Sequence, residues 1–303
     1  MKSEDKVGLV GTGMLGNAVG LHLLKTGYDL TAYNRTREKT LGLEKNGASI
    51  VDSPMDVARS SDLVITCVKD ANAVKSVSFE KNGIVEGRHE NLVVADMSTI
   101  NPIESRKIAN KLNDFNIVML DIPVMGGPNV AIKGELVLMV SGDENAFNKH
   151  KKIFEVIARQ VFFLGKNGVA HSVKLALNLQ IVMLALAISE GITLARASSV
   201  DPEVFLKILN STYFKTGMSE NKAYKMIKDK FEPTFTLKNM KKDLGTINET
   251  AKSLGLNLPM SFKAEELYRT AIEDGFGDLD YTGILAYLKQ ATKTENLQNR
   301  LDE

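Results

Sequence analysis

The sequence predicts an α/β protein, in which an N-terminal doubly wound parallel sheet is followed by an all-helical C-terminal domain. From Val7 to about Gly165, short apolar runs alternate with helical patterns, which is the order of a parallel sheet covered by helices on both faces. After Gly168 the strand candidates disappear and long helical segments take over. A chain of 303 residues is long enough for two domains, which we place at residues 1–167 and 168–303.

The expected strands are short apolar runs bounded by turn residues. In chain order they are VGLV, DLTAY, DLVITCV, LVVAD, IVMLD, ELVLMV and QVFFL. The last runs lie closer together than the others, which allows antiparallel pairs among them. In the C-terminal half, expected helix boundaries lie near Pro202, Pro233 and Pro259.

Composition argues against a nucleic-acid-binding function and bears on the state of the single cysteine. Lysine and arginine total 38 against 37 aspartate and glutamate, so the charge balance gives no reason to expect a nucleic acid as partner. The single cysteine, Cys67, cannot form an intrachain disulfide, which fits a reducing compartment, and we expect it to be a small core residue.

The sequence also bears on location and assembly. The N-terminus MKSEDKVGLVG lacks the apolar region of a signal peptide, and the apolar stretch IVMLALAI is shorter than the roughly 20 residues that span a bilayer. We therefore expect a cytoplasmic protein without a membrane partner. The helix that continues from Leu175 is more apolar than one small domain needs, which predicts a homodimer or homotetramer.

A glycine-rich turn predicts a dinucleotide site. In VGLVGTGMLGNAVGLHLLKTG, the glycines have the GxGxxG spacing, follow a strand and open a helix. The first glycine permits the turn, the second lets a pyrophosphate approach the backbone, and the third allows close packing of helix and strand. The alternative is a turn without a ligand. The cofactor-binding residues expected here are Gly11, Thr12, Gly13, Met14, Leu15 and Gly16.

The end of the second expected strand favours NADP(H) over NAD. An NAD site usually has an acidic residue there for the ribose 2′-hydroxyl, whereas this chain has AYNRT. Asn34 carries no repelling charge, Arg35 can bind a 2′-phosphate, and Thr36 can donate a hydroxyl. The alternative is an ordinary solvated arginine at a strand end.

A small polar patch interrupts the apolar helix VKLALNLQIVMLALAISEG. Lys174 and Asn178 are four residues apart and so share one face of the helix. Next to a redox cofactor, such an ammonium could exchange a proton with a substrate oxygen that the amide holds in place. The alternative is a lysine whose charge reaches solvent. For His171, one turn earlier, nothing in the sequence identifies a partner, and a structural role is expected.

At these residues the chain resembles the β-hydroxyacid dehydrogenase family, which includes 3-hydroxyisobutyrate dehydrogenase. The similarity extends over nearly the whole length, and the blocks occur in family order: GLVGTGMLG, DMSTINP, DIPVMGGP, GVAHSVKLALN and FTLKNMKKDL. In this family the lysine of the KxxxN pair is the general acid/base, which implies that role for Lys174. The resemblance likewise makes Asn178 the second catalytic residue, and both would also contact the substrate.

The resemblance implies further contacts around a small carboxylate substrate. DMSTINP follows an apolar strand, so Ser98 and Thr99 should lie at the carboxyl edge of the sheet, near the substrate and the nicotinamide. In DIPVMGGP, Gly126 and Gly127 would offer backbone N–H groups to a carboxylate. The alternatives are a helix N-cap for Ser98 or Thr99 and a plain turn for Gly126 and Gly127. Where the family commonly has serine this chain has Met125, which removes a hydroxyl and makes the pocket more apolar.

Two further segments complete the expected cofactor site. The family lysine of FTLKNMKKDL corresponds to Lys242, which would reach the cofactor or substrate from the helical domain. The loop after the Cys67 strand would run past the cofactor ribose and contact it through Val68 and Lys69. We expect the other lysines around Lys242 to lie on a solvated helix face.

The predicted function is that of an NADP-dependent β-hydroxyacid dehydrogenase, which transfers a hydride between nicotinamide and C3 of a small 3-hydroxy acid or its semialdehyde. One alternative is a glyoxylate/succinic semialdehyde reductase, whose motifs are nearly the same. An alternative of another class is an inactive dinucleotide-binding sensor or scaffold, against which the presence of both Lys174 and Asn178 argues. The same lysine argues against an imine reductase, whose sequences replace it.

Overall fold

The structure is a computed structural model that describes residues 6–299. Residues 1–5, part of the segment in which no signal peptide was expected, lie outside this range. Internal contacts divide the chain into two compact units, Met1–Leu175 and Ala176–Glu303, and helix α8 (Val169–Ala197) contributes to both. The domain boundary expected between residues 167 and 168 stays a prediction.

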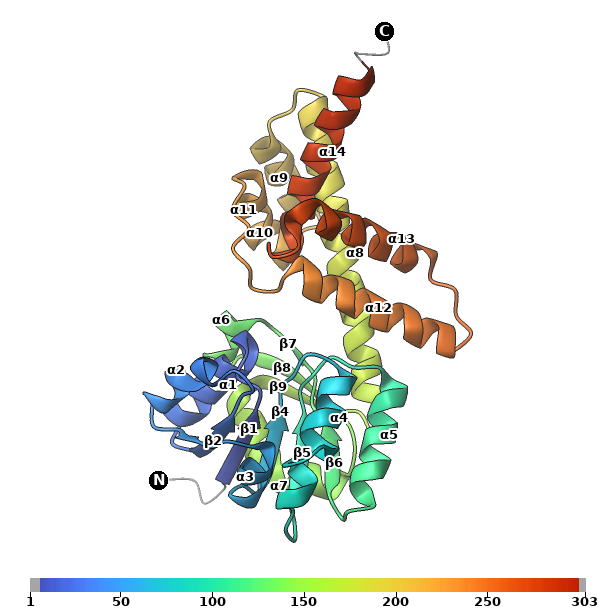
Figure 1. The fold of residues 1–303 in the computed structure, drawn as a ribbon. Coiled ribbons are helices and arrows are strands. Elements are labelled where there is room, and N and C mark those ends of the chain that lie inside the picture. Colours follow the sequence, from blue (N-terminus) through green and yellow to red (C-terminus); the bar gives the residue numbers. More distant parts are fainter. Residues whose placement is uncertain (1–5, 300–303) are drawn as a thin grey trace. The chain divides into compact units, whose positions relative to one another are not determined.

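The first unit contains a parallel sheet that confirms the expected doubly wound architecture (Figure 1). The strand order is β3-β2-β1-β4-β5-β6, with all neighbours parallel. Strands β1 to β3 are added in one direction across the sheet, and β4 to β6 are added in the other, so the strand order reverses between β1 and β4. Ligands of open α/β sheets bind beyond the carboxyl ends of the strands at such a point. The strands are β1 (Lys6–Val10), β2 (Asp29–Tyr33), β3 (Ser49–Ile50), β4 (Leu63–Thr66), β5 (Val93–Asp96) and β6 (Val118–Asp121).

Both faces of this sheet are buried in apolar cores, and successive side chains of each strand point to opposite faces. Leu63 and Ile65 belong to one apolar core, while Val64 between them belongs to the other. The helical elements of this part of the chain are α1 (Met14–Lys25), η1 (Arg37–Thr40), α2 (Leu41–Glu44), α3 (Pro54–Arg59), α4 (Ala71–Phe79), η2 (Ile84–Gly87), α5 (Pro102–Asn113), α6 (Pro128–Ala131) and α7 (Glu144–Ile157).

A second, smaller sheet combines β7 (Val124–Met125), β8 (Leu136–Val140) and β9 (Ala158–Phe163). The antiparallel pairing allowed in this region is found between β7 and β8, whereas β8 and β9 are parallel because α7 connects them as a crossover. Strands β3 and β7 were not predicted. Each has two residues, too few to show an alternating pattern.

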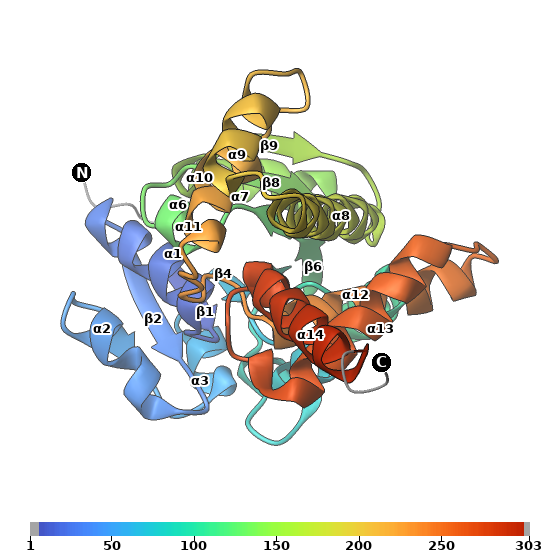
Figure 2. The ribbon, with the colours of Figure 1, turned by 90° about the horizontal axis from the view of Figure 1, so that it is seen from above.

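The second unit is helical, as predicted. Pro202 and Pro259 begin helices, as expected, since proline is well tolerated at the first helical position. Helices α12 and α13 lie side by side (Figures 1 and 2). Besides the C-terminal part of α8, the unit contains α9 (Pro202–Asn210), α10 (Gly217–Asn221), α11 (Ala223–Ile227), α12 (Leu237–Ser253), α13 (Pro259–Ala271), η3 (Ile272–Phe276), η4 (Tyr281–Gly283) and α14 (Ile284–Asn299).

Helix α8 is the one helix in the described part of the chain that is long and apolar enough to cross a membrane by length and composition. The core helices of soluble proteins meet the same criterion. In α8, Val182, Ala185 and Ile192 are fully buried within the protein.

Candidate active site

The glycine turn has the geometry that the GxGxxG spacing predicts. Gly11 follows β1 with φ +101°, and a Cβ there would lie 2.3 Å from the carbonyl oxygen of Cys67. A Cβ at Gly16 would lie 2.1 Å from the carbonyl oxygen of Gly11. At Gly13, by contrast, a Cβ would meet nothing within 4 Å. The outer glycines are therefore required by close backbone contacts, while the middle one leaves an open approach to the backbone.

The start of α1 fits the pyrophosphate of a dinucleotide. Gly13 is the N-cap residue, and no side chain of the described residues caps this helix end. The first-turn N–H groups of a helix have no partner within the helix, and they carry the positive end of its dipole. Met14 follows half exposed, and Leu15 packs against the apolar core. This turn lies at the carboxyl end of β1, beside the point where the strand order of the sheet reverses.

Asn34 connects the glycine turn to the loop after β2. Its Oδ1 accepts a hydrogen bond from the backbone N–H of Thr12 (3.0 Å), and its Nδ2 donates to the carbonyl of Thr36 (2.8 Å). The Thr12 hydroxyl donates to the carbonyl of Lys39 (3.0 Å). The side chains of Arg35 and Thr36 are exposed at the carboxyl end of β2. Asn34 thus organises the loop, and its two neighbours present their side chains to solvent.

The predicted loops after β4 and β5 are joined by a hydrogen bond. The buried hydroxyl oxygen of Ser98 accepts a bond from the backbone N–H of Val68 (3.0 Å), and the Ser98 N–H donates to Asp96 Oδ1 (3.3 Å). Thr99 is half-buried and Lys69 is exposed. Ser98 therefore holds the two loops together at the carboxyl edge of the sheet.

The structure brings Lys174 and Met125 together. Lys174 is half-buried on the first turns of α8, and its Nζ lies 3.4 Å from Met125 Sδ, to which it donates. Met125 ends β7, and the exposed Gly126 and Gly127 follow it. Gly126 has φ +121°, a conformation that favours glycine, whereas Gly127 has an ordinary φ of −94°. The lysine thus lies beside the segment in which the substrate carboxylate was expected.

In the helical unit, Asn178 is held by a residue that was not predicted. Its Nδ2 donates to Asp243 Oδ2 (2.7 Å), and both side chains are buried. The predicted Lys242 has its Nζ 2.5 Å from Asp243 Oδ1. Asp243 is a negative group that fixes the Asn178 amide on α8, one turn after Lys174. The sequence signal was present, since Asp243 stands inside FTLKNMKKDL.

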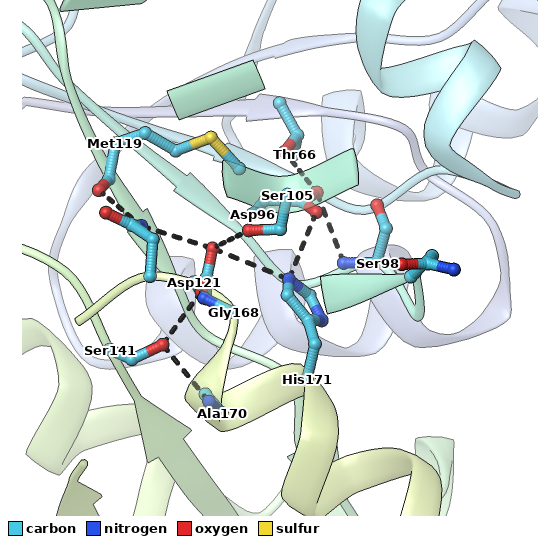
Figure 3. Close-up of polar contacts among 12 residues, drawn as sticks. Thr66, Asp96, Ser98, Ser105, Met119, Asp121, Ser141, Gly168, Ala170 and His171 are labelled. Carbon is cyan, nitrogen blue, oxygen red and sulfur yellow. Dashed lines mark hydrogen bonds and ion pairs between the residues drawn. The ribbon is translucent and has the colours of Figure 1, made fainter. Parts of the chain in front are cut away.

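A buried polar cluster lies at the carboxyl ends of β5 and β6 (Figure 3). Thr66, Asp96 and Asp121 occupy the same register at the ends of β4, β5 and β6. The imidazole of His171 has its Nε2 at 3.6 Å from Asp121 Oδ1 and 3.9 Å from Asp96 Oδ2. The side chains of Asp96, Asp121 and His171 have no exposed surface. His171, expected to be structural, thus faces two carboxylates.

The two carboxylates differ in environment. Asp121 accepts from the hydroxyls of Ser105 (2.5 Å) and Ser141 (2.8 Å) and from the backbone N–H of Gly168 (2.5 Å). Burial alone would raise the pKa of Asp121, but His171 and the bonds from Ser105 and the Gly168 N–H hold it at about 2. Burial raises the pKa of Asp96, because His171 and the donors on Oδ1 compensate only in part. No hydrogen-bond donor among the described residues reaches Asp96 Oδ2.

Comparison with protein-family models identifies both parts of the chain. Residues 6–165 match the NAD binding domain of 6-phosphogluconate dehydrogenase. Residues 168–288 match the domain described as NAD-binding of NADP-dependent 3-hydroxyisobutyrate dehydrogenase. The first match alone covers more than half of the chain.

Individual proteins are similar over nearly their full length. Glyoxylate/succinic semialdehyde reductase 1 of Arabidopsis thaliana is 31% identical, covering 94% of this chain and 98% of the relative. The 2-hydroxy-3-oxopropionate reductase of Escherichia coli is 30% identical, covering 94% of this chain and 97% of the relative. Among solved structures, 3-hydroxyisobutyrate dehydrogenase from Salmonella typhimurium superposes with a TM-score of 0.85 at 26% identity, covering 94% of this chain and all of the other.

Proposed function

The chain belongs to the β-hydroxyacid dehydrogenase family of nicotinamide-dependent oxidoreductases, and on that premise we propose that it is an NADP(H)-dependent enzyme acting on a small 3-hydroxy acid or the matching semialdehyde. The observation that carries this proposal is the position of Lys174. Its half-buried ammonium lies 3.4 Å from Met125, within the segment proposed to hold the substrate.

The proposed chemistry divides between cofactor and protein. The glycine turn would hold the nicotinamide cofactor, which would supply hydride transfer to and from C3 of the substrate. Lys174 exchanges a proton with the substrate oxygen through Nζ, acting as the general acid/base. Asn178, whose amide orientation is fixed by Asp243, positions that oxygen. In this proposal Gly126 and Gly127 bind the substrate carboxylate through their N–H groups.

The preference for NADP(H) over NAD is proposed from the loop after β2. Arg35 and Thr36 are exposed there, and no carboxylate stands at the end of β2 to bind a 2′-hydroxyl. A guanidinium is well suited to a phosphate, with which it can form two parallel hydrogen bonds. The proposed cofactor contacts further include the glycine turn, Val68, Lys69, Thr99 and Lys242.

The substrate is proposed only as a class. Met125 places a thioether, not a hydroxyl, beside Lys174, which favours a substrate with an apolar group at that point. A glyoxylate/succinic semialdehyde reductase is the second candidate, because relatives with that name match nearly the whole chain. A panel of small hydroxy acids and semialdehydes with both cofactors, followed by absorbance of the reduced nicotinamide, discriminates between these substrates.

For the cellular context, we propose a cytoplasmic homodimer or homotetramer with no nucleic-acid or membrane partner. The nearly balanced charge of 38 basic and 37 acidic residues supports the absence of a nucleic-acid partner. Exposed apolar residues on α8, among them Val173, Leu177 and Leu194, support self-association.

Lys174→Met tests the proposed function. Methionine keeps much of the aliphatic volume and suits an apolar helix, so stability should be equal or slightly higher. Cofactor affinity should hardly change, because the glycine turn binds it without the ammonium. Turnover should fall roughly 10²–10⁴-fold, and the loss should appear in kcat, not only in KM. Steady-state kinetics on a substrate that the parent protein converts give both constants.

A matched control is Lys75→Met, which removes an ammonium that pairs with Glu104 on α5 and should leave kcat unchanged. Asn178→Ala should lower kcat by less than Lys174→Met, because it orients the oxygen without exchanging its proton. Near-normal kcat in Lys174→Met would contradict the proposal. If the parent binds NADP(H) tightly yet converts nothing in the panel, the sensor or scaffold alternative is favoured.

A further inference from the structure

We propose that His171 is a positioning residue, which links the carboxylates at the ends of β5 and β6 and thereby sets the helical turn that presents Lys174. The inference rests on the proposed role of Lys174. It concerns contacts within the first unit only, where His171 and Lys174 lie three residues apart on α8 and share a face of the helix.

Burial and short contacts define the place of His171 in the cluster. The carboxyl groups of Asp96 and Asp121 have no exposed surface, and polar groups are costly to bury without polar partners. The His171 ring lies between them, with its Nε2 at 3.6 Å from Asp121 Oδ1 and 3.9 Å from Asp96 Oδ2. Among the described residues, the cluster does not form a group able to hold a metal ion. His171 is therefore the side chain that contacts both buried carboxyl groups.

Asp121 anchors the beginning of α8 on one side of this link. It accepts from the backbone N–H of Gly168, directly before the helix, and from Ser141, whose oxygen also accepts from the N–H of Ala170 (3.1 Å). A carboxylate at a helix N-terminus is stabilised by the helix dipole. These bonds fix where the helix starts, and the His171 side chain fixes its rotation about the axis.

Asp96 extends the link to the loops proposed for substrate and cofactor. Its Oδ1 accepts from Thr66 (2.7 Å) and from the N–H of Ser98, and Ser98 in turn accepts from Val68. His171 is thus the one side chain in Figure 3 that faces both the Asp96 group and the Asp121 group. Removal of the His171 ring should let the turn of α8 that carries Lys174 move relative to the loop that contains Ser98.

His171→Leu tests this, with His150→Leu as the matched control. His150 is also a buried histidine, but it belongs to α7. We expect His171→Leu to lower kcat roughly 10–100-fold, the cost of a displaced catalytic group, with NADP(H) affinity unchanged within about twofold. His171→Gln keeps an amide donor for the carboxylates and should recover part of the loss. His150→Leu should retain kcat even where its melting temperature falls equally.

A second measurement needs no substrate. The rate at which trinitrobenzenesulfonate labels Lys174, followed by peptide mass spectrometry, reports the surroundings of the ammonium that now rests against Met125. Labelling should be faster in His171→Leu than in the parent and in His150→Leu. Because labelling needs no substrate, it tests the positioning of Lys174 even if the proposed enzymatic function is wrong. Equal labelling and equal kcat in the two leucine variants would overturn the proposal, and where His171→Leu does not fold, His171→Gln decides by the same two measures.

The two aspartates should respond differently to neutralisation. Asp121→Asn removes a charge that receives bonds from two hydroxyls and a backbone N–H, so the start of α8 should loosen, kcat should fall and labelling of Lys174 should accelerate. Asp96→Asn should have the smaller effect on both, because Oδ2 of Asp96 has no donor among the described residues. The reverse order would also contradict the proposed link.

Discussion

Arg35 is the residue on which the proposed choice of cofactor depends. Its side chain is exposed at the end of β2, where a ribose 2′-phosphate would be bound. Arg35→Ala should weaken NADPH binding by about 1.5–3 kcal/mol, the usual contribution of a charge-assisted hydrogen bond, and should change NADH binding little. Titration of both cofactors by fluorescence measures the difference.

Arg37→Ala is the control in the same loop, because the Arg37 guanidinium already pairs with Asp52 (2.9 Å). It should change neither affinity by more than a few tenths of a kcal/mol, as expected for an exposed ion pair. Equal losses for NADPH and NADH in Arg35→Ala would show that Arg35 does not bind the 2′-phosphate.

Asp121 predicts a stability effect that depends on pH. The pKa of Asp121 is held at about 2 in the folded protein, against 3.8 for an unperturbed side chain, so the folded state favours the ionised form. This stabilisation, about 2 kcal/mol, should be fully present above pH 4 and be lost as the pH falls towards 2. Urea unfolding of the parent and of Asp121→Asn should therefore differ less at pH 2 than at pH 6.

Asp96 should contribute with the opposite sign, because burial raises its pKa. Its contribution is present below pH 3.8 and is lost as the pH rises through the folded-state pKa. Asp96→Asn should therefore gain stability relative to the parent as the pH increases from acid towards neutral. A stability difference that does not depend on pH would contradict the assignment for Asp121 if it is found in Asp121→Asn, and the assignment for Asp96 if it is found in Asp96→Asn.

At the scale of elements, substitutions at two glycines of the turn between β1 and α1 should affect protein stability and cofactor binding separately. A methyl group at Gly16 would lie 2.1 Å from the Gly11 carbonyl oxygen, so Gly16→Ala should force helix and strand apart. We expect a loss of stability of about 1–3 kcal/mol, as for other overpacked sites. At Gly13 the methyl group would meet nothing within 4 Å, so Gly13→Ala should fold normally.

Cofactor binding should show the complementary result. The methyl group of Gly13→Ala would occupy the space through which a pyrophosphate approaches the first turn of α1, so dinucleotide affinity should fall although the melting temperature does not. Thermal denaturation and cofactor titration on the same two variants measure both quantities. Undiminished affinity in Gly13→Ala would place the pyrophosphate elsewhere.

At the scale of the whole molecule, self-association is the main prediction. The apolar side chains of Val173, Leu177 and Leu194 on α8 are exposed in the single chain, and Leu194 retains 70% of its accessible surface. We expect light scattering at micromolar concentration to give a multiple of the monomer mass of 33.2 kDa.

Leu194→Glu would place a charge on this face of α8 and should shift the mass towards the monomer. Leu254→Glu is the control, because Leu254 is also exposed, at 59%, but follows α12. A parent protein that is monomeric under these conditions, or equal effects of the two variants, would rule out the proposed role of α8.

The sequence by itself determined the strands of the doubly wound sheet other than β3, the helical C-terminal part and the glycine turn. These features depend on local periodicity and on backbone requirements that each residue type carries with it. Gly11 and Gly16 illustrate this, because the spacing alone implied the close backbone contacts that the structure shows. Strands β3 and β7 were missed, since two residues cannot establish a period.

Only the tertiary structure decided which polar residues act together. His171 precedes Lys174 by three residues, yet its partners Asp96 and Asp121 come from strands far earlier in the chain and meet because β5 and β6 end in register. Asp243 likewise reaches Asn178 across 65 positions of sequence. A buried charge is stabilised by whatever the fold brings within a few ångströms, and sequence spacing carries no information about such distances.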